Sequence, residues 1–390
     1  MKKKVLIVTG GYLPGKNFGG PVTSLVNFVE LLKDDFEIHI VTSDHDLKNN
    51  KRIETIQYGW NTCNGAKVLY LADKEKTLNY LKKVVLTVQP DLIYCNSIFD
   101  YKFTIPFVKI THSMKKPLLL AARGEMQPNA LKIKSWKKKP YLSFFKRIIR
   151  SPEIYFQGSS DVECKNIQSV LKIEATKCFI LSNVPNIKFL SKNINYEDKR
   201  DKILRIITVS RIHPIKNLLY SLKLLKKIEF NVQFDIYGPI EEEIYWKKCQ
   251  QIISTLDSNI SVTHKGYLDA EEKFQAYDSH DVFLFPTITE NFGHVISEAM
   301  SSGCPVIISN NTPWSWINEK KCGYALPLED GDAYLKALYS IKEMDKDNYA
   351  QLRYQCQCET RAFLAIDRLK KDYITVFDKI MIEEKRDEFI

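Results

Sequence analysis

The sequence predicts an α/β protein made of two doubly wound, Rossmann-like domains. Three features indicate this architecture: a length of 390 residues, an alternation of strands with helices, and one polar segment near the middle of the chain. A chain of this length is too long for one ordinary core and suggests two domains of about 150–200 residues each. Strands that alternate with amphipathic helices are typical of parallel sheets covered by helices.

Strand candidates in the first half are short runs rich in β-branched and other apolar residues. They are Val5–Thr9, Phe36–Thr42, Val68–Leu71, Asp91–Asn96, Leu118–Ala122 and Ile154–Gln157. The segments between them have helical periodicity, for example Pro21–Lys33 and Thr77–Thr87. Pro21 suits the first turn of a helix, because its missing N–H is not needed there.

The second half repeats the alternation after a charged segment over residues 191–202, which we interpret as a linker. Its strand candidates are Leu204–Ser210, Val232–Tyr237, Ile260–His264, Val282–Phe285 and Val306–Ser309. From about Asp332 onward the pattern is helical and charged. We therefore predict a first domain over residues 1–190, a second over 203–370, and a last helix over 371–390 that stands alone or returns to the first domain.

The composition is that of a globular protein without a membrane span, because 44% of the residues are hydrophobic and 27% are charged. No run approaches the ~18 consecutive apolar residues that a transmembrane helix needs. The basic start and the apolar run after it imitate a signal peptide, but polar Thr9 ends that run too early. We therefore expect a cytoplasmic protein.

Metal-ligand motifs do not stand out in the sequence. It has no His-Glu-x-x-His, and among nine irregularly spaced cysteines the closest pair is Cys356 with Cys358, with no second pair to complete a zinc site. We therefore expect no metal and no cofactor.

The net charge of +10 is concentrated in the first half. Residues 1–190 carry 30 Lys and Arg against 16 Asp and Glu, a balance of +14. Within them, Leu131–Arg150 holds eight cations and no acid, interleaved with aromatic residues such as Trp136 and Phe144. Cations beside aromatic side chains are typical of segments that lie on an anionic membrane surface. A solvated amphipathic helix is one alternative, and a nucleic-acid-binding surface without a recognition motif is another.

The most informative segment is Phe283–Pro305, where a strand, a loop and a helix follow one another. Glu290 precedes the expected helix, and Glu298 lies about two turns inside it. The residues at the expected helix start are Asn291, Phe292 and Gly293. If the whole stretch were helical, the eight residues from Glu290 to Glu298 would span roughly 12 Å, the reach from a sugar ring across a diphosphate to a ribose. Free amides at the helix start favour an anion such as that diphosphate. An ordinary helix with two surface carboxylates is the alternative.

Two cations follow the first strand of the second half. Arg211 and Lys216 lie five residues apart, between the end of that strand and the next helix. Arg can bind a phosphate with two parallel hydrogen bonds, and Lys adds a mobile charge. At the carboxyl end of a strand, such a pair can neutralise a departing diphosphate. A solvated basic turn is the alternative.

Three further loops carry weaker signals. Gly19 and Gly20 precede the first helix and would let a phosphate approach the backbone closely, unless the loop is only a flexible surface loop. Gly238 and Tyr267 lie in two loops that each follow a strand, where a glycine usually only makes a turn. Each of these two loops is poor evidence for a binding site by itself.

Arg123 and Glu125 follow the fifth strand of the first half. One interpretation is a buried ion pair between Arg123 and Glu125 that holds the loop.

Together these motifs resemble the retaining glycosyltransferases of family 4, which have the GT-B fold, with two Rossmann-like domains facing each other across a cleft. The resemblance is specific over Leu204–Pro327 and looser in the first half. It includes Glu298-Ala299-Met300, Gly303-Cys304-Pro305-Val306 and Thr312-Pro313-Trp314. The last motif is found in a subgroup that builds bacterial surface polysaccharides.

The resemblance implies roles for the candidate residues. Glu290 would hold hydroxyls of the donor sugar, Glu298 would hold the ribose, and the diphosphate would lie against Arg211 and Lys216. The other donor-binding residues would be Gly19, Gly20, Gly238, Tyr267, Asn291, Phe292 and Gly293, with the loops of Gly238 and Tyr267 beside the nucleobase. On the acceptor side, Arg123 and Glu125 would face the reacting centre, which is an equal alternative to an ion pair between them. Arg123 matches the Arg-Gly of the subgroup, whereas Glu125 stands where the subgroup usually has an apolar residue.

The implied activity is the transfer of a sugar, with retention, from a nucleotide diphosphate sugar to an acceptor hydroxyl, without a metal. The basic first half favours a lipid-linked saccharide as acceptor, with Leu131–Arg150 on the inner face of the membrane and no nucleic-acid partner. One alternative is a nucleotide-sugar epimerase of related two-domain fold. A nucleic-acid-binding protein that uses the basic half is a weaker alternative.

Overall fold

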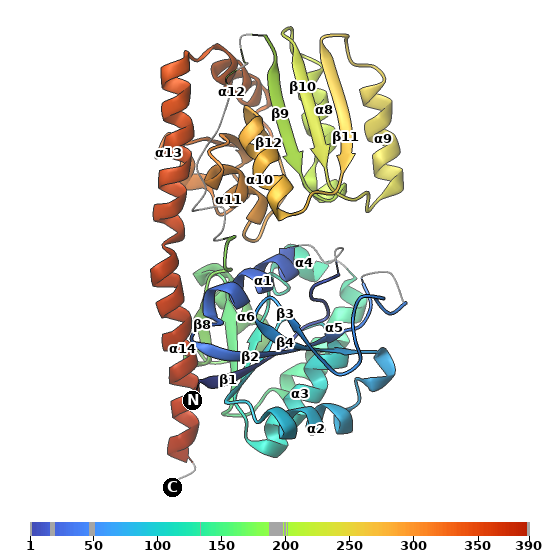
Figure 1. Cartoon of the computed structure of the whole chain (residues 1–390), viewed down its shortest axis with the longest axis vertical. Coiled ribbons are helices and arrows are strands. Elements are labelled where there is room, and N and C mark those ends of the chain that lie inside the picture. The colour runs from blue at the N-terminus through green and yellow to red at the C-terminus, as the bar shows by residue number, and fades with distance from the viewer. Residues whose placement is uncertain are drawn as a thin grey trace. The chain divides into compact units, whose positions relative to one another are not determined.

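The computed structural model describes residues 2–15, 20–46, 51–132, 134–186, 198, 200 and 202–387. The chain forms two compact units (Figure 1). Unit 1 comprises Met1–Val184 and Ile366–Ile390, and unit 2 comprises Pro185–Ala365. The boundaries therefore fall earlier than the predicted positions 190 and 370, and most of the predicted linker, residues 191–202, lies outside the described residues.

Unit 1 contains an eight-stranded sheet in the order β3-β4-β2-β1-β5-β6-β7-β8. Its strands are β1 (Lys3–Val8), β2 (Phe36–Ser43), β3 (Trp60–Cys63), β4 (Ala66–Leu71), β5 (Leu92–Cys95), β6 (Leu118–Ala121), β7 (Ile154–Gly158) and β8 (Cys178–Ile180). All neighbours pair in parallel except β3 and β4, which form an antiparallel hairpin. The sequence analysis missed β3 and β8. Both are short and only partly buried: β3 has two polar residues in the middle of its four positions, and the apolar run of β8 has only three residues.

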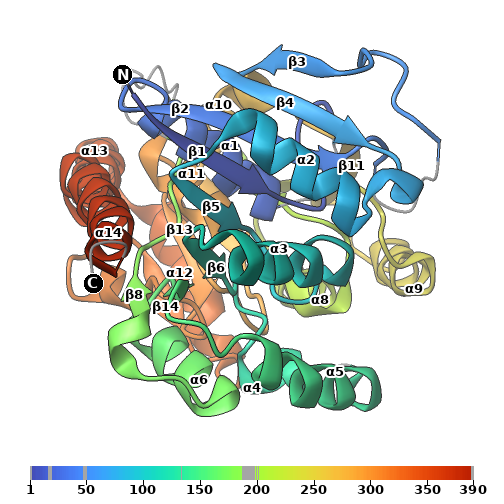
Figure 2. The ribbon, with the colours of Figure 1, turned by 90° about the horizontal axis from the view of Figure 1, so that it is seen from below.

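Helices cover both faces of this sheet. They are α1 (Gly20–Leu32), η1 (Asp73–Glu75), α2 (Leu78–Val88), α3 (Tyr101–Met114), α4 (Pro128–Lys132), α5 (Ser135–Ile148), α6 (Asp161–Leu171) and η2 (Ala175–Lys177). In β1, Val5 and Ile7 face the cluster with α1, whereas Leu6 and Val8 face the cluster with α2 and α3. The latter two helices lie side by side (Figures 1 and 2). Burial on both faces explains the continuous apolar run of β1.

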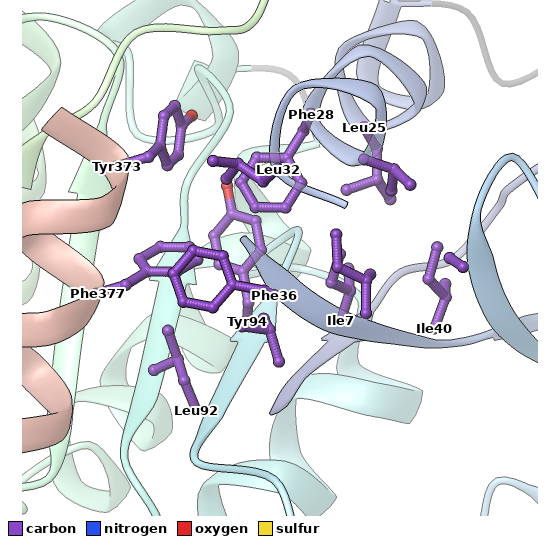
Figure 3. Packing of buried hydrophobic residues seen from close by; sticks show 14 of the residues in the cluster. Ile7, Leu25, Phe28, Leu32, Phe36, Ile40, Leu92, Tyr94, Tyr373 and Phe377 are labelled. Carbon is purple, nitrogen blue, oxygen red and sulfur yellow. The ribbon is translucent and has the colours of Figure 1, made fainter. Parts of the chain in front are cut away.

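The last helix, α14 (Ile366–Asp387), belongs to unit 1. Its buried residues Leu369, Tyr373, Phe377 and Ile380 recur at helical spacing, so they form one apolar stripe. Tyr373 and Phe377 project from α14 toward Phe28 of α1, with ring centroids 5.2 and 6.0 Å from that ring (Figure 3). The chain therefore returns to the core of its first unit.

Unit 2 contains six parallel strands in the order β11-β10-β9-β12-β13-β14. They are β9 (Leu204–Val209), β10 (Val232–Tyr237), β11 (Ile260–Gly266), β12 (Val282–Phe285), β13 (Val306–Ser309) and β14 (Tyr324–Leu326). Its helices are η3 (Pro214–Lys216), α8 (Leu218–Leu225), α9 (Glu243–Ile253), α10 (Ala270–Ser279), α11 (His294–Ser301), η4 (Ser315–Asn318), α12 (Gly331–Glu343) and α13 (Lys346–Leu364). The strand order reverses between β9 and β12, and sheets of this order bind ligands beyond the carboxyl ends of the strands at that point.

Candidate functional site

The candidate site of unit 2 lies where the loops after β9 and β12 meet. The Ile288 amide donates to the Ile215 carbonyl at 2.8 Å, and the Thr287 hydroxyl donates to the same oxygen at 3.0 Å. In the other direction, Asn217 Nδ2 donates to the Pro286 carbonyl at 3.0 Å. These bonds fix two loops from different strands against each other, so the side chains that the loops carry are held together.

Lys216 and Glu290 form an ion pair at this junction. Lys216 Nζ lies 2.6 Å from Glu290 Oε2, and the two side chains are only 16% and 18% exposed. The ammonium group also lies 5.4 Å from the centroid of the Phe285 ring. The structure therefore brings together Lys216, which we expected to bind a diphosphate, and Glu290, which we expected to bind a sugar.

Arg211 follows β9 and remains more open than Lys216. Its Nη1 lies 2.5 Å from Glu241 Oε2, and its side chain is 43% exposed. Sequence reasoning missed Glu241, although this acid follows the Gly238-Pro239 turn by two residues. Because Glu241 occupies one edge of the guanidinium, an anionic ligand would bind the remaining donors or displace the carboxylate.

The helix after Glu290 begins later than predicted. The structure starts α11 at His294, with Gly293 as its N-cap, whereas the sequence analysis expected the start near Asn291 and Phe292. Gly293 has φ +80°, and a Cβ there would lie 2.8 Å from the Ile296 side chain. This left-handed residue ends the loop sharply, so Asn291 and Phe292 lie in the loop and not in the first helical turn.

Trp314 holds that loop in place. Its indole Nε1 donates to the Phe292 carbonyl at 2.6 Å, and its fully buried ring lies 6.0 Å from the Phe292 ring. The Thr312 hydroxyl accepts from the Trp314 amide at 3.3 Å. The Thr312-Pro313-Trp314 motif therefore acts as a brace for the segment that carries Glu290.

Glu298 lies inside α11 and is only 2% exposed. Its Oε2 lies 3.5 Å from Lys273 Nζ of α10. Burial raises the pKa of the Glu298 carboxyl, and the nearby Lys273 charge opposes that rise. A ribose hydroxyl that binds this carboxylate would share it with Lys273 or displace the Lys273 ammonium group. The sequence analysis did not identify Lys273 as a neighbour of Glu298.

Gly238 and Tyr267 are the first residues after β10 and β11. A Cβ on Gly238 would lie 1.9 Å from the Ser210 carbonyl oxygen, so only glycine fits there. The Gly238 amide donates to Gly266 O at 2.7 Å, and its carbonyl lies 2.8 Å from His264 Nε2. Tyr267 is exposed. The tight strand packing explains Gly238, and a role of either residue beside a nucleobase stays a prediction.

Arg123 lies at the carboxyl end of β6 in unit 1, with φ +49°. Its Nε donates to Asn96 Oδ1 at 2.5 Å, its Nη2 donates to the Tyr94 hydroxyl at 2.7 Å, and its Nη1 donates to Asn183. Glu125 instead accepts hydrogen bonds from Ser97 and Ile98. Arg123 and Glu125 therefore have separate partners and do not form the ion pair that was the alternative interpretation.

Glu125 anchors the loop after β5. Its carboxylate accepts from the Ser97 hydroxyl at 2.6 Å and from the Ile98 amide at 2.7 Å. Burial raises the pKa of Glu125 to about 7, and the hydrogen bonds from Ser97 and Ile98 limit the rise. This acid therefore positions the backbone beside Arg123, and it titrates near neutral pH.

Two other expectations concern the glycine loop and metals. Gly19 lies outside the described residues, and Gly20 is the first residue of α1. Within the described ranges, no group of three or more His, Cys, Asp or Glu side chains is arranged to hold a metal ion. A phosphate near the two glycines stays a prediction.

The basic segment Leu131–Arg150 consists mainly of α5. Trp136 and Phe144 are 72% and 46% exposed and lie eight residues apart, so they point from the same side of the helix. Lys137 and Lys139 are exposed beside them, while the opposite side of α5 packs into the core of unit 1. Among the described parts of the chain, we find no helix of the length and apolarity that crossing a membrane requires.

Residues 191–357 match the family described as glycosyl transferases group 1. The matched range contains Arg211, Lys216, Glu290 and Glu298, and it corresponds to most of unit 2.

Curated relatives match parts of the chain. A capsular polysaccharide biosynthesis glycosyltransferase, CapM of Staphylococcus aureus, is 28% identical over 135 residues, which is 32% of this chain and 34% of that protein. Sulfoquinovosyl transferase SQD2 of Arabidopsis thaliana is 34% identical over 103 residues, which is 26% of this chain and 18% of that protein. The matches thus span about a third or less of these relatives.

Solved structures match the chain over nearly its whole length. Alr3699/HepE of Anabaena, solved in complex with UDP and glucose, has a TM-score of 0.72 at 16% identity, with 97% of this chain and 100% of that chain covered. Sucrose-phosphate synthase of Thermosynechococcus elongatus has a TM-score of 0.70 at 15% identity, with 98% and 100% covered. The predicted fold class is therefore confirmed: two Rossmann-like domains of the GT-B fold.

Proposed function

We propose that this chain is a glycosyltransferase that moves a sugar from a nucleotide diphosphate sugar, bound by unit 2, to an acceptor hydroxyl. The family match over residues 191–357 and the glycosyltransferases among the relatives support the class of reaction. Alr3699/HepE was solved with UDP and glucose, which supports a nucleotide sugar as donor.

The observation that carries the proposal is the Lys216–Glu290 ion pair between β9 and β12. In a nucleotide sugar, the bond that breaks joins the sugar to a phosphate oxygen. Residues that bind the sugar hydroxyls and the phosphate must therefore lie within a few ångströms of each other. A carboxylate and an ammonium 2.6 Å apart at the ligand-binding edge of the sheet meet this requirement.

The chemistry follows from the charges of these groups. As the bond from the anomeric carbon to the diphosphate breaks, negative charge grows on the departing oxygen, and Arg211 and Lys216 stabilise it. The acceptor oxygen attacks the anomeric carbon from the same face and gives its proton to the departing phosphate oxygen. Because attack and departure occur on the same face, the configuration is retained. Lys216 has three N–H donors, so it can keep its bond to Glu290 and also bind a phosphate. With Arg211 and Lys216 stabilising the charge, the proposed reaction requires no metal.

A panel of nucleotide sugars tests the proposal. We expect the chain to bind one nucleoside diphosphate and to hydrolyse slowly, or transfer, the matching sugar, with activity that EDTA does not change. Binding of none of the panel would contradict the proposed donor. Isomerisation of a nucleotide sugar without an acceptor would favour the epimerase, an alternative that the glycosyltransferase relatives do not favour.

We further propose a lipid-linked saccharide in surface polysaccharide synthesis as the acceptor. The exposed pair Trp136 and Phe144 and the cations around it support membrane binding by α5. Near an anionic leaflet each cation contributes about 1 kcal/mol, and the two aromatic side chains add apolar burial. A saccharide carried on a polyprenyl diphosphate would present its hydroxyls at the level of the lipid headgroups, where α5 would lie.

A charge reversal on α5 tests this surface. Lys137→Glu with Lys139→Glu is expected to abolish binding to phosphatidylglycerol vesicles in a flotation assay, while Lys138, whose Nζ donates to the Ala130 carbonyl at 2.6 Å, stays intact. The matched control reverses the exposed Lys226 and Lys227 of unit 2 and should leave binding unchanged. Equal loss in both variants, or no wild-type binding at low salt, would contradict a specific membrane surface.

A further inference from the structure

Arg123 has an unusual backbone conformation. It lies at φ +49°, and the next residue, Gly124, lies at φ +81°. Left-handed conformations are uncommon for residues other than glycine, and they collect at functional sites where the surroundings fix them. The surroundings of Arg123 must therefore hold it in this conformation.

A buried chain of hydrogen bonds links Arg123 to the last helix. Arg123 Nη2 donates to the Tyr94 hydroxyl at 2.7 Å, and that hydroxyl donates to Gln157 Oε1 at 2.7 Å. Gln157 Nε2 donates to the Tyr373 hydroxyl at 3.1 Å, and Tyr373 donates to the Ser182 carbonyl at 2.9 Å. Each phenol donates once and accepts once, so the direction of every bond in the chain is fixed.

A second route joins the same two residues. The Tyr373 hydroxyl holds the carbonyl of Ser182, and the side chain of the next residue, Asn183, accepts from Arg123 Nη1. Loss of the Tyr373 hydroxyl would therefore loosen Arg123 from two sides, through Tyr94 and through Asn183.

Tyr373 is itself firmly placed. Its ring is fully buried and lies 5.2 Å from the Phe28 ring in a T-shaped contact (Figure 3). On the same helix, Asp378 pairs with Lys3 of β1 at 2.7 Å. The buried packing fixes α14 against α1 and the sheet of unit 1, and this exposed ion pair adds little, so the helix can serve as a rigid support for the hydroxyl.

We propose that Tyr373 is a positioning residue that holds Arg123 ready for the acceptor. This inference rests on the proposed function and on the expectation from the sequence that Arg123 lies on the acceptor side. Arg123 has five N–H donors, and its hydrogen bonds to Asn96, Tyr94 and Asn183 orient the guanidinium plane. A guanidinium whose plane is fixed loses little freedom when it binds a hydroxyl or a phosphate.

Tyr373→Phe tests the proposal, because it keeps the ring against Phe28 and removes only the hydroxyl. We expect about a tenfold lower rate of transfer to a polyprenyl-diphosphate-linked monosaccharide, as for loss of one buried hydrogen bond, with unchanged affinity for UDP. Tyr94→Phe, which removes the hydroxyl next to Arg123, should lower the rate of transfer further. The matched control is Tyr349→Phe in unit 2, which removes a buried hydroxyl that donates to the Asp281 carbonyl, before β12.

A second measurement, by NMR on the Arg123 side chain, does not depend on sugar transfer. The Arg123 Nε–H resonance in ¹⁵N-arginine spectra, assigned by its loss in Arg123→Lys, should shift and exchange about tenfold faster in Tyr373→Phe but not in Tyr349→Phe. An unchanged resonance would overturn the positioning role, and so would equal loss of transfer in both variants. If the wild type transfers no sugar, the proposed function fails, while the resonance still decides whether Tyr373 positions Arg123.

Discussion

The Lys216–Glu290 ion pair predicts strong coupling between two substitutions. Lys216→Met and Glu290→Gln each remove one charge and nearly keep the shape of the side chain. Because the atoms are 2.6 Å apart and both side chains are less than a fifth exposed, we expect a coupling energy of about 2 kcal/mol, or roughly 30-fold. Exposed pairs couple by only ~0.2–1 kcal/mol, since water screens them.

The magnitude sets the expected rates. Each single substitution should lower turnover of the donor by ~100-fold, the usual cost of losing one group that stabilises charge in the transition state. Independent effects would multiply to ~10⁴-fold in the double variant, whereas the coupling should limit its loss to roughly 300-fold. Single-turnover hydrolysis of the donor gives the four rates, and thermal melting shows whether each variant is folded.

The control is the ion pair between Lys67 and Glu37 in unit 1. Its atoms are 2.9 Å apart, but the side chains are 57% and 35% exposed. Lys67→Met, Glu37→Gln and their combination should leave turnover unchanged. A double variant of Lys216 and Glu290 that loses the full ~10⁴-fold would refute the reasoning, because the two groups would then act independently.

Three further outcomes are expected. Arg211→Ala should lower turnover by ~100-fold or more in the same assay, and wild-type turnover would remove this residue from the site. Glu298→Ala should weaken binding of the nucleoside diphosphate about tenfold in calorimetry with a smaller effect on the rate of transfer, whereas equal small effects on both would make Glu298 a structural residue. Glu125 should make stability depend on pH, because its pKa is about 7 in the folded protein and near 4.5 in the unfolded chain. Between these values the folded protein binds the extra proton. The free energy of unfolding should therefore fall as pH rises through this window, by on the order of 3 kcal/mol. Glu125→Gln should flatten that slope in urea titrations, and an equal slope in both proteins would assign it to another group.

The sequence by itself determined the fold class and the positions of the site-bearing loops. Buried parallel strands are continuous apolar runs, so β1 and β12 could be located from local pattern alone. The cations Arg211 and Lys216 and the acid Glu290 could be found because each follows such a strand. Short, partly exposed strands such as β3 carry no comparable signal, and the start of α11 depends on the conformation of one residue, Gly293.

Only the tertiary structure decided which of these residues meet. Lys216 and Glu290 are 74 residues apart in the chain, and β9 and β12 become neighbours only through the strand order of the sheet. Tyr373 reaches Gln157 across 216 residues, because α14 returns to the first unit. A hydrogen bond or an ion pair requires a few ångströms in space, whereas sequence patterns report only the burial periodicity of neighbouring residues.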